Sequence, residues 1–275
     1  MSLMLDMAVR DGRLARNVAT HVNLPRPVKP EHRYLTHNQV EALANETGHP
    51  SAPSKHSSMD TRANENYRLV VLFLTYTGVR FGEMAALRVR RLDLVRRRAM
   101  IAESVTPLQG HGMVWGTPKS HHRREVPIPG FLAEELTRHV AGRDPDDLVF
   151  GGLRNNGPLR STVFRTAFST AARAISVPGL HPHDLRHTAA SLAIAAGADV
   201  KVVQKMLGHA SAAMTLDTYG HLFADRLDEV ADALSAAREA ERQLPRPADD
   251  RTIQGSIEPP RGDRQLPPET DGPRL

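Results

Sequence analysis

Apolar residues recur every three or four positions over most of the chain, with polar residues between them. This spacing places the apolar side chains on one face of a helix and predicts a mainly helical protein. The predicted helices cover residues 3–9, 36–44, 66–74, 81–87, 131–140, 161–175, 184–196, 199–208, 211–219 and 225–242. End signals support several boundaries: the N-cap candidates are Thr36, Asp199 and Ser211, and the closing glycines are Gly12, Gly197 and Gly208.

Three short stretches in the middle of the chain have strand character instead. They cover residues 98–106, 112–118 and 124–128 and are separated by turn residues. Each is short and polar on one side, which predicts one small antiparallel sheet at the surface. We therefore expect the α+β class, with helices in the majority.

The two ends of the chain differ from the body in composition. Residues 24–30 read LPRPVKP, and three prolines in seven residues predict an extended linker. From Leu244 onward the chain holds seven prolines and almost no bulky apolar residue. Such a segment buries too little apolar surface to offset the entropy of ordering, so we expect a disordered tail.

Composition excludes several classes of protein. The 275 residues include no cysteine, which excludes disulfides, thiolate nucleophiles, iron–sulfur clusters and cysteine zinc sites. No run of eighteen apolar residues exists, so a membrane-spanning helix is not expected. The first residues lack the basic and apolar regions of a signal peptide, and the expected location is the cytoplasm.

The charge balance favours a polyanionic partner. Lys and Arg number 36 against 31 Asp and Glu, a formal net charge of +5, and all but five of the basic residues are arginine. The guanidinium group binds phosphate through paired hydrogen bonds, which suits nucleic acid. On charge alone, a solvated arginine-rich surface is an equally good interpretation.

Four segments carry candidate chemistry, and each also has a plain structural interpretation. Arg80 follows a glycine at a helix start with Glu83 one turn on, which fits either a surface ion pair or an anion site. His183 and Arg186 lie three residues apart and so share a helix face. Residues 199–219 could form a helix–turn–helix.

A metal site is a weaker interpretation of the histidines. His181, His183 and His187 are close in sequence, but no HExxH motif and no cysteine accompany them.

Taken together, these segments resemble the tyrosine recombinase family of the phage integrase type. The order Arg, Lys, His-x-x-Arg, Gly-His, Tyr extends over about 140 residues. The matching strings are TGVRFGEMAAL, RREVPIP after Lys119, HPHDLRHTAAS and LGHASAAMTLDTYGHL. The resemblance covers residues 34–223 and implies the catalytic-domain fold of that family. The composition, rich in arginine and alanine, suggests an actinobacterial phage or prophage member.

The resemblance implies a role for each catalytic position. Tyr219 would attack the scissile phosphorus and form a 3′-phosphotyrosine, which conserves the bond energy and needs no cofactor and no metal. Arg80, Arg186 and His209 would hold the non-bridging oxygens. His183 would act as general base toward the tyrosine hydroxyl.

Two further residues complete the implied site. Lys119 would protonate the departing 5′-oxygen, because a lysine whose pKa is lowered by nearby cations releases a proton and arginine does not. Glu83 would orient Arg80. The residues expected to contact the DNA backbone are Arg88, Arg90, Arg91, Arg96, Arg97, Arg98, Arg123 and Arg124.

The implied function is site-specific recombination, the integration or excision of phage DNA. The partners would be double-stranded attachment sites, three further copies in a tetramer on DNA, and an accessory directionality or DNA-bending protein. Two alternatives remain open: a catalytically idle DNA-binding prophage remnant, and a helix–turn–helix regulator. A type IB topoisomerase would share the chemistry.

The resemblance also predicts a domain organisation. Residues 1–30 resemble the last helix of a truncated core-binding domain followed by the interdomain linker. Residues 31–243 would form the catalytic domain, and residues 244–275 the tail. Without the rest of the core-binding domain, we expect weak and salt-sensitive DNA binding.

Overall fold

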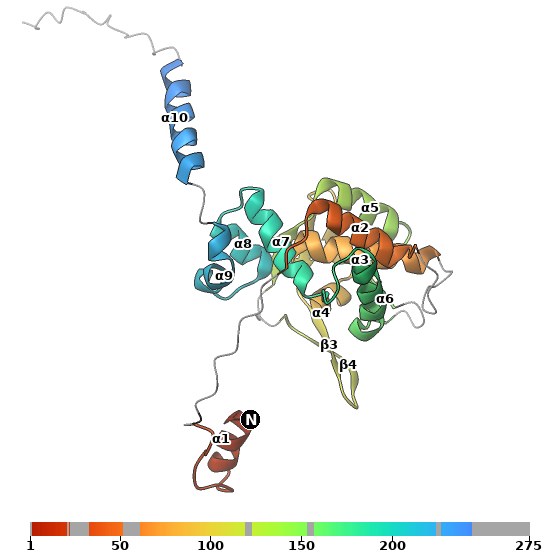
Figure 1. Cartoon of the computed structure of the whole chain (residues 1–275). Helices are drawn as coiled ribbons and strands as arrows, with labels where there is room; N and C mark the ends of the chain where they lie inside the picture. Colours follow the sequence, from red (N-terminus) through yellow and green to blue (C-terminus); the bar gives the residue numbers. More distant parts are fainter. Residues whose placement is uncertain are drawn as a thin grey trace, which may run out of the picture. The chain divides into compact units, whose positions relative to one another are not determined.

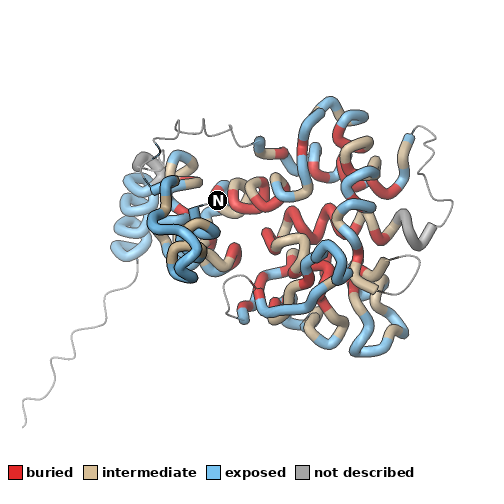
Figure 2. The backbone as a smooth tube through the Cα atoms, turned by 90° about the horizontal axis from the view of Figure 1, so that it is seen from below, coloured by how far each residue is buried: buried red, intermediate tan, exposed pale blue. Residues whose placement is uncertain are grey.

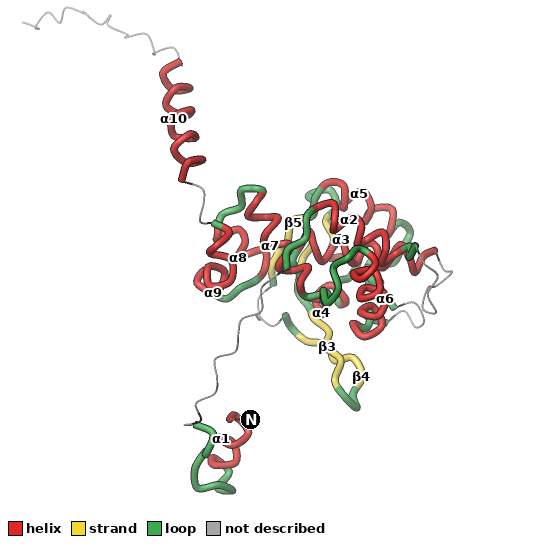
Figure 3. The backbone as a smooth tube through the Cα atoms, viewed as in Figure 1, coloured by secondary structure: helices red, strands yellow, loops and turns green. Residues whose placement is uncertain are grey.

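The computed structural model describes residues 2–20, 22, 33–51, 61–118, 123–152, 157–223 and 227–243. The chain divides into two compact units, Met1–Asp225 and Arg226–Leu275. Helices predominate in the described residues and strands form a minor part (Figure 3), which confirms the predicted class. The expected linker at residues 24–30 and the expected tail from residue 244 lie outside the described residues.

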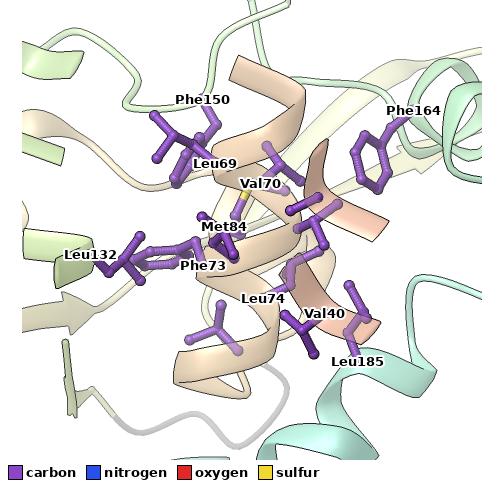
Figure 4. Packing of buried hydrophobic residues seen from close by; sticks show 14 of the residues in the cluster. Val40, Leu69, Val70, Phe73, Leu74, Met84, Leu132, Phe150, Phe164 and Leu185 are labelled. Carbon is purple, nitrogen blue, oxygen red and sulfur yellow. The ribbon is translucent and has the colours of Figure 1, made fainter. Parts of the chain in front are cut away.

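A large core cluster forms around α3 (Thr61–Thr77), which packs against α2 (His37–Gly48) and α5 (Gly130–Val140). The α6 helix (Ser161–Ala174) packs on α2 (Figure 1). Residues 69–74 of α3 are all buried, because this stretch is apolar on every face and so can be covered on several sides. Figure 4 shows Phe73 of α3 packing near Leu132 of α5, with Phe150 and Phe164 also in the cluster.

The short helix α4 (Phe81–Ala85) and the 3-10 turn η1 (Val89–Arg91) lead from this core into the strands. β1 (Leu92–Asp93), β2 (Arg98–Ile101) and β5 (Arg124–Pro127) form one antiparallel sheet in the order β1-β2-β5. β3 (Ser104–Leu108) and β4 (Gly112–Gly116) form a separate two-stranded ribbon.

The prediction of a single sheet with a strand over residues 98–106 was therefore wrong. That stretch is two strands, β2 and β3, in two different sheets. Ala99 and Ile101 of β2 are buried in the large core cluster, whereas β3 is exposed beyond Val105. The two halves bury their apolar residues against different partners, because Val105 packs with Ala85 and Ala86 of the α4 region.

Three helices of the C-terminal half of the first unit carry the rest of the site. They are α7 (Asp184–Ala195), α8 (Val200–Leu207) and α9 (Ala212–Tyr219), followed by η2 (Gly220–Leu222). The capping predictions are confirmed here: Asp199 accepts from the backbone N–H of Val202 at 2.8 Å, and Ser211 caps α9. Gly208 ends α8 in the left-handed conformation, with φ +66°.

These helices share a small core cluster. Its buried members are Ala189, Ala190, Ile194, Val203, Met206, Leu207 and Tyr219. Figure 2 shows buried positions recurring along the helices of the first unit.

The end helices are α1 (Ser2–Arg10) and α10 (Leu227–Gln243). The α10 helix lies in the second unit. No helix among the described residues is both long and apolar enough to span a membrane.

Candidate active site

Glu83 is the anchor of the site. It lies in the first turn of α4, is only 1% exposed, and accepts four hydrogen bonds from two arginines. The backbone N–H and Nη1 of Arg80 donate to it at 2.9 and 3.0 Å, and Nη1 and Nη2 of Arg124 donate at 3.1 and 2.6 Å. Burial acts to raise the pKa of Glu83, but the hydrogen bonds and charge of Arg124, with those of Arg80, hold it below its usual range. The carboxylate is therefore charged at neutral pH.

Arg124, which the sequence grouped with the DNA-contacting arginines, is a buried connection between two parts of the site. Besides the pair to Glu83, its Nε donates to the carbonyl of Met206 at 3.2 Å. The guanidinium runs directly beneath Gly208, where an added Cβ would come within 2.9 Å of Nε. Because these three hydrogen bonds reach both Glu83 and Met206, Arg124 ties α4 to the end of α8.

Arg186 is also almost completely buried. Its Nη1 donates to the carbonyl of Gly78 at 2.6 Å, and its Nη2 donates to the carbonyl of Leu207 at 2.7 Å. Burial, followed by the positive charge of Arg80, lowers the pKa of Arg186 to about 10, so it stays protonated at neutral pH. Gly78 has φ +65°, and a Cβ there would lie 2.7 Å from Cδ2 of Leu207, so the close approach of α3 to α8 requires glycine.

His209 follows Gly208 in the turn between α8 and α9. Its Nδ1 lies 3.0 Å from the hydroxyl of Thr215, which is buried. Burial, then the charges of Arg186 and Arg80, lower the pKa of His209 to about 4. The ring is therefore neutral at pH 7. We assign the tautomer in which Thr215 donates to Nδ1 and Nε2 carries the proton.

Tyr219 closes α9 and is the largest fully buried side chain of the described residues. Its hydroxyl lies 2.9 Å from Nδ1 of His187. Its ring stacks on that of His209, with centroids 6.4 Å apart and planes 5° apart. Burial raises the pKa of Tyr219 to about 12, although the charge of Arg186 opposes the shift. The phenol therefore keeps its proton in this pocket.

His187, which lies beside the nucleophile, is not among the predicted catalytic residues. His183 is the N-cap residue of α7, and its ring meets that of His187 edge-on at 5.6 Å. His187 lies four residues after His183, so the helical spacing that grouped His183 with Arg186 also includes His187. That spacing was a usable signal, but nothing in the local pattern indicated that Tyr219 contacts this face.

The structure brings most of the predicted catalytic residues together. Arg80, Glu83, Arg186 and His209 are linked by hydrogen bonds or by their mutual charge, and Tyr219 stacks on His209. Two guanidinium groups contact the carboxylate of Glu83, and the charge of Arg186 acts on the same site, which leaves an excess of positive charge suited to a phosphodiester. Lys119 lies outside the described residues. Within the described part of the chain, no group of three or more His, Asp or Glu side chains is arranged to hold a metal ion.

The predicted DNA-contacting arginines fall into different environments. Nη1 of Arg88 donates to the carbonyl of Asp146 at 2.6 Å, and its guanidinium lies 5.1 Å from the ring centre of Trp115. Arg90 pairs with the carboxylate of Asp146. Nε of Arg91 is buried without a hydrogen-bond partner among the described residues. These three side chains are held against the protein or partly covered by it.

The remaining arginines of the predicted set are exposed. They are Arg96, Arg97, Arg98 and Arg123. Arg96 and Arg97 lie in the turn between β1 and β2, and Arg98 begins β2. The side chain of Arg96 is 83% exposed. Arg98 pairs with Pro127 and Ile101 with Arg124, so this turn lies at the opposite end of the β2–β5 ladder from the buried Arg124.

Comparison with protein families and curated sequences gives consistent results. A family model described as the phage integrase family matches residues 33–226. The prophage phiRv2 integrase of Mycobacterium tuberculosis is 33% identical over 180 residues, which cover 63% of this chain and 47% of that protein. The ICEBs1 integrase of Bacillus subtilis is 31% identical over 60% of this chain and 46% of its own length. The chain spans about half the length of these curated relatives.

Solved structures share the fold. The Tn1549 transposon integrase in complex with a circular intermediate DNA superposes with a TM-score of 0.64 at 20% identity, covering 88% of this chain and 76% of that one. The XerA recombinase gives a TM-score of 0.50 at 22% identity, covering 80% of this chain and 67% of that one. The predicted catalytic-domain fold is thereby confirmed.

Proposed function

The chain belongs to the phage integrase family, and from this premise we propose that it cleaves and rejoins double-stranded DNA through a covalent link to Tyr219. One observation carries the proposal: the ring of Tyr219 stacks on His209, which lies in the combined positive field of Arg186, Arg80 and Arg124. A nucleophile beside a cationic pocket is the arrangement that phosphoryl transfer needs. The Tn1549 integrase, whose fold is similar, is described in complex with DNA, which supports DNA as the substrate.

The nucleophilic step conserves the energy of the phosphodiester. The Oη atom of Tyr219 attacks phosphorus, and the bond from phosphorus to the 5′-oxygen breaks. The products are a 3′-phosphotyrosine and a free 5′-hydroxyl. A 5′-hydroxyl from either duplex reverses the step and releases Tyr219, so no nucleotide cofactor is required.

The arginines and His209 stabilise the charge that gathers on the non-bridging oxygens. Arg186 has five N–H donors, and two of its nitrogens are held by the carbonyls of Gly78 and Leu207. These bonds fix the plane of the guanidinium and leave other donors for phosphate. Nη1 of Arg80 is oriented by Glu83 in the same way. Neutral His209 donates a further hydrogen bond to these oxygens from Nε2–H.

Proton transfer needs a donor for the 5′-oxygen and an acceptor for the tyrosine proton. The resemblance assigns the first role to Lys119, and the presence of only five lysines in the chain supports a specific use for it. The second role falls to α7, where His183 and His187 lie on one helix face. Family resemblance assigns that role to His183.

Further arginines contribute to affinity. The exposed residues Arg96 and Arg97 of the β1–β2 turn, Arg98 at the start of β2, and Arg123 would contact the phosphate backbone. Such contacts raise affinity and its salt dependence without selecting sequence. We propose a homotetramer on two attachment sites, assisted by an accessory directionality or DNA-bending protein, as the family resemblance implies.

A covalent trap tests this function. The protein is incubated at saturating concentration with a nicked duplex that loses the 5′-hydroxyl strand after cleavage, and adducts are separated under denaturing conditions. The wild-type chain and the control Tyr76→Phe should form an adduct that maps to Tyr219, whereas Tyr219→Phe should bind DNA and form none. An adduct in Tyr219→Phe contradicts the assignment of the nucleophile. Binding by the wild type without any adduct would favour the idle remnant or the regulator.

A further inference from the structure

The hydroxyl of Tyr219 hydrogen-bonds to a histidine outside the His-x-x-Arg motif. The partner is Nδ1 of His187, at 2.9 Å, one residue after Arg186 on α7. We assign the tautomer in which Nε2 carries the ring proton, so that the hydroxyl donates to Nδ1. We propose that His187 accepts the proton of Tyr219 when the tyrosine attacks DNA, an inference that rests on the proposed function. The base role that the resemblance gives to His183 would then pass to its neighbour one turn along the helix.

The geometry of the contact supports direct proton transfer. A general base must lie within about 2.6–3.2 Å of the atom that loses its proton, and His187 meets this requirement before DNA arrives. Both groups belong to regular elements, since His187 lies within α7 and Tyr219 ends α9. Tyr219 is 1% exposed, so in this position its proton has a protein acceptor instead of bulk water.

The charges around the pair explain why a base is needed. In the buried pocket the phenol retains its proton at neutral pH, because burial raises its pKa. His183 meets His187 edge-on from the same helix, and His209 stacks on the ring of Tyr219. The positive charge of Arg186 acts to lower the pKa of the phenol, and Tyr34 acts to raise it. As the bond to phosphorus forms, the phenol becomes strongly acidic, and Nδ1 lies 2.9 Å away to accept its proton.

The step balances without any further reactant. The Oη–H bond breaks and its proton moves to Nδ1, while the Oη–P bond forms and the bond from phosphorus to the 5′-oxygen breaks. The 5′-oxygen takes its proton from Lys119, the donor that the proposed function assigns. In resealing, the 5′-hydroxyl returns its proton to the neutral amine of Lys119, and imidazolium His187 returns one to the departing tyrosine oxygen. His183, edge-on to His187, acts as a positioning residue.

Single-turnover cleavage of the nicked duplex as a function of pH tests the role. His187→Asn retains an oxygen near the position of Nδ1 that accepts a hydrogen bond but does not take up the proton, and His187→Ala removes both properties. Both variants should cleave about 10²–10⁴-fold more slowly at neutral pH. The deficit should shrink as pH rises, because solvent then deprotonates the phenol without a base. His183→Ala should lose rate without this alkaline recovery, and the control His181→Asn should match the wild type.

Two outcomes overturn the proposal. One is a wild-type rate for His187→Asn, which would limit His187 to hydrogen bonding. The other is an alkaline recovery seen with His183→Ala and absent with His187→Ala, which would return the base role to His183.

A second measurement separates this inference from the proposed function. In protein labelled with ¹³C at tyrosine Cζ, Tyr219→Phe identifies the Tyr219 resonance. His187→Ala should move that resonance and His181→Asn should not; an unmoved resonance overturns the contact itself. If the wild-type protein binds DNA and forms no adduct, the proposed function fails, and with it the proton transfer, while the resonance still reports whether the contact exists.

Discussion

The two core clusters of the first unit differ in what fills them. The large core cluster around α3 contains four fully buried phenylalanines, namely Phe73, Phe150, Phe164 and Phe168. The small core cluster of α7, α8 and α9 has seven buried members, two of them alanines, and its largest side chain is Tyr219 itself. Because buried aromatic area dominates core energetics, the first cluster is expected to determine global stability. In the second cluster, the nucleophile is a major part of the packing.

The difference indicates that the two sides of the site differ in local stability. Arg80 is the N-cap residue of α4, and Glu83 lies in its first turn. This helix lies next to the large core cluster, so both charged groups are held in place by that packing. Tyr219, His209 and Arg186 belong to the segment with little bulky apolar packing. Segments with few buried apolar contacts open at lower free energy than the core. The α8–α9 segment should therefore be the part of the site that can open while the α4 side stays folded.

The largest effect should follow from removing the carboxylate that joins the two sides. Glu83→Ala leaves buried Arg124 without its ion pair and should lower the free energy of unfolding by about 3–5 kcal/mol. Chemical denaturation measures the loss. Glu83→Gln, which retains the size and one of the two acceptor oxygens, is the matched variant and should lose less. Equal stability of Glu83→Ala and wild type would mean that the pair contributes nothing to joining α4 to α8.

A matched pair of leucine truncations compares the clusters directly. Leu132 and Leu207 are both fully buried, one in each cluster. Leucine-to-alanine changes cost about 2–5 kcal/mol, and we expect Leu132→Ala near the top of that range and Leu207→Ala near the bottom. Hydrogen exchange should show Leu207→Ala accelerating the amides of α8 and α9 selectively. A uniform acceleration over both clusters would argue that they unfold as one unit.

A smaller effect is expected where Arg124 passes beneath the turn of the α8 helix. Gly208→Ala combines positive φ with a Cβ only 2.9 Å from Nε of Arg124. Gly142 has φ +72° but open space, so Gly142→Ala isolates the backbone strain, about 1–2 kcal/mol. Gly208→Ala should be less stable than this control and should also slow adduct formation. Equal losses of stability in both variants would show that Arg124 moves aside for the new Cβ at no cost in stability.

A pH dependence arising from His209 is also expected. Its pKa is about 4 in the folded protein against an ordinary value of 6.5, so between these values the unfolded chain binds a proton that the folded chain does not. Stability should therefore rise with pH across that window and gain nothing more from this group above it. Denaturant unfolding from about pH 4 to about pH 7.5 measures the slope, and His209→Gln should flatten it. An unchanged slope would assign the effect to other groups.

The sequence by itself determined the local structure and the list of candidate residues. Helix periodicity and caps such as Asp199 and Ser211 act within a few residues, so they are readable without the fold. The order of Arg80, His183, Arg186, His209 and Tyr219 likewise identified the family before any geometry was known. Strand pairing was less accessible, because β2 and β3 differ only in which partner covers them.

Only the tertiary structure decided which of these residues touch. In the sequence, Arg124 resembles the other surface arginines. In the structure it is buried against Glu83, which lies 41 residues away in the chain. Tyr219 meets His187 across 32 residues, and the helical spacing of α7 does not show which of its histidines faces α9. Periodicity reports the face of a helix, but the identity of the group that packs on that face depends on how distant segments meet. For this reason the charge pair and the hydrogen bond of the nucleophile could be found only in the folded chain.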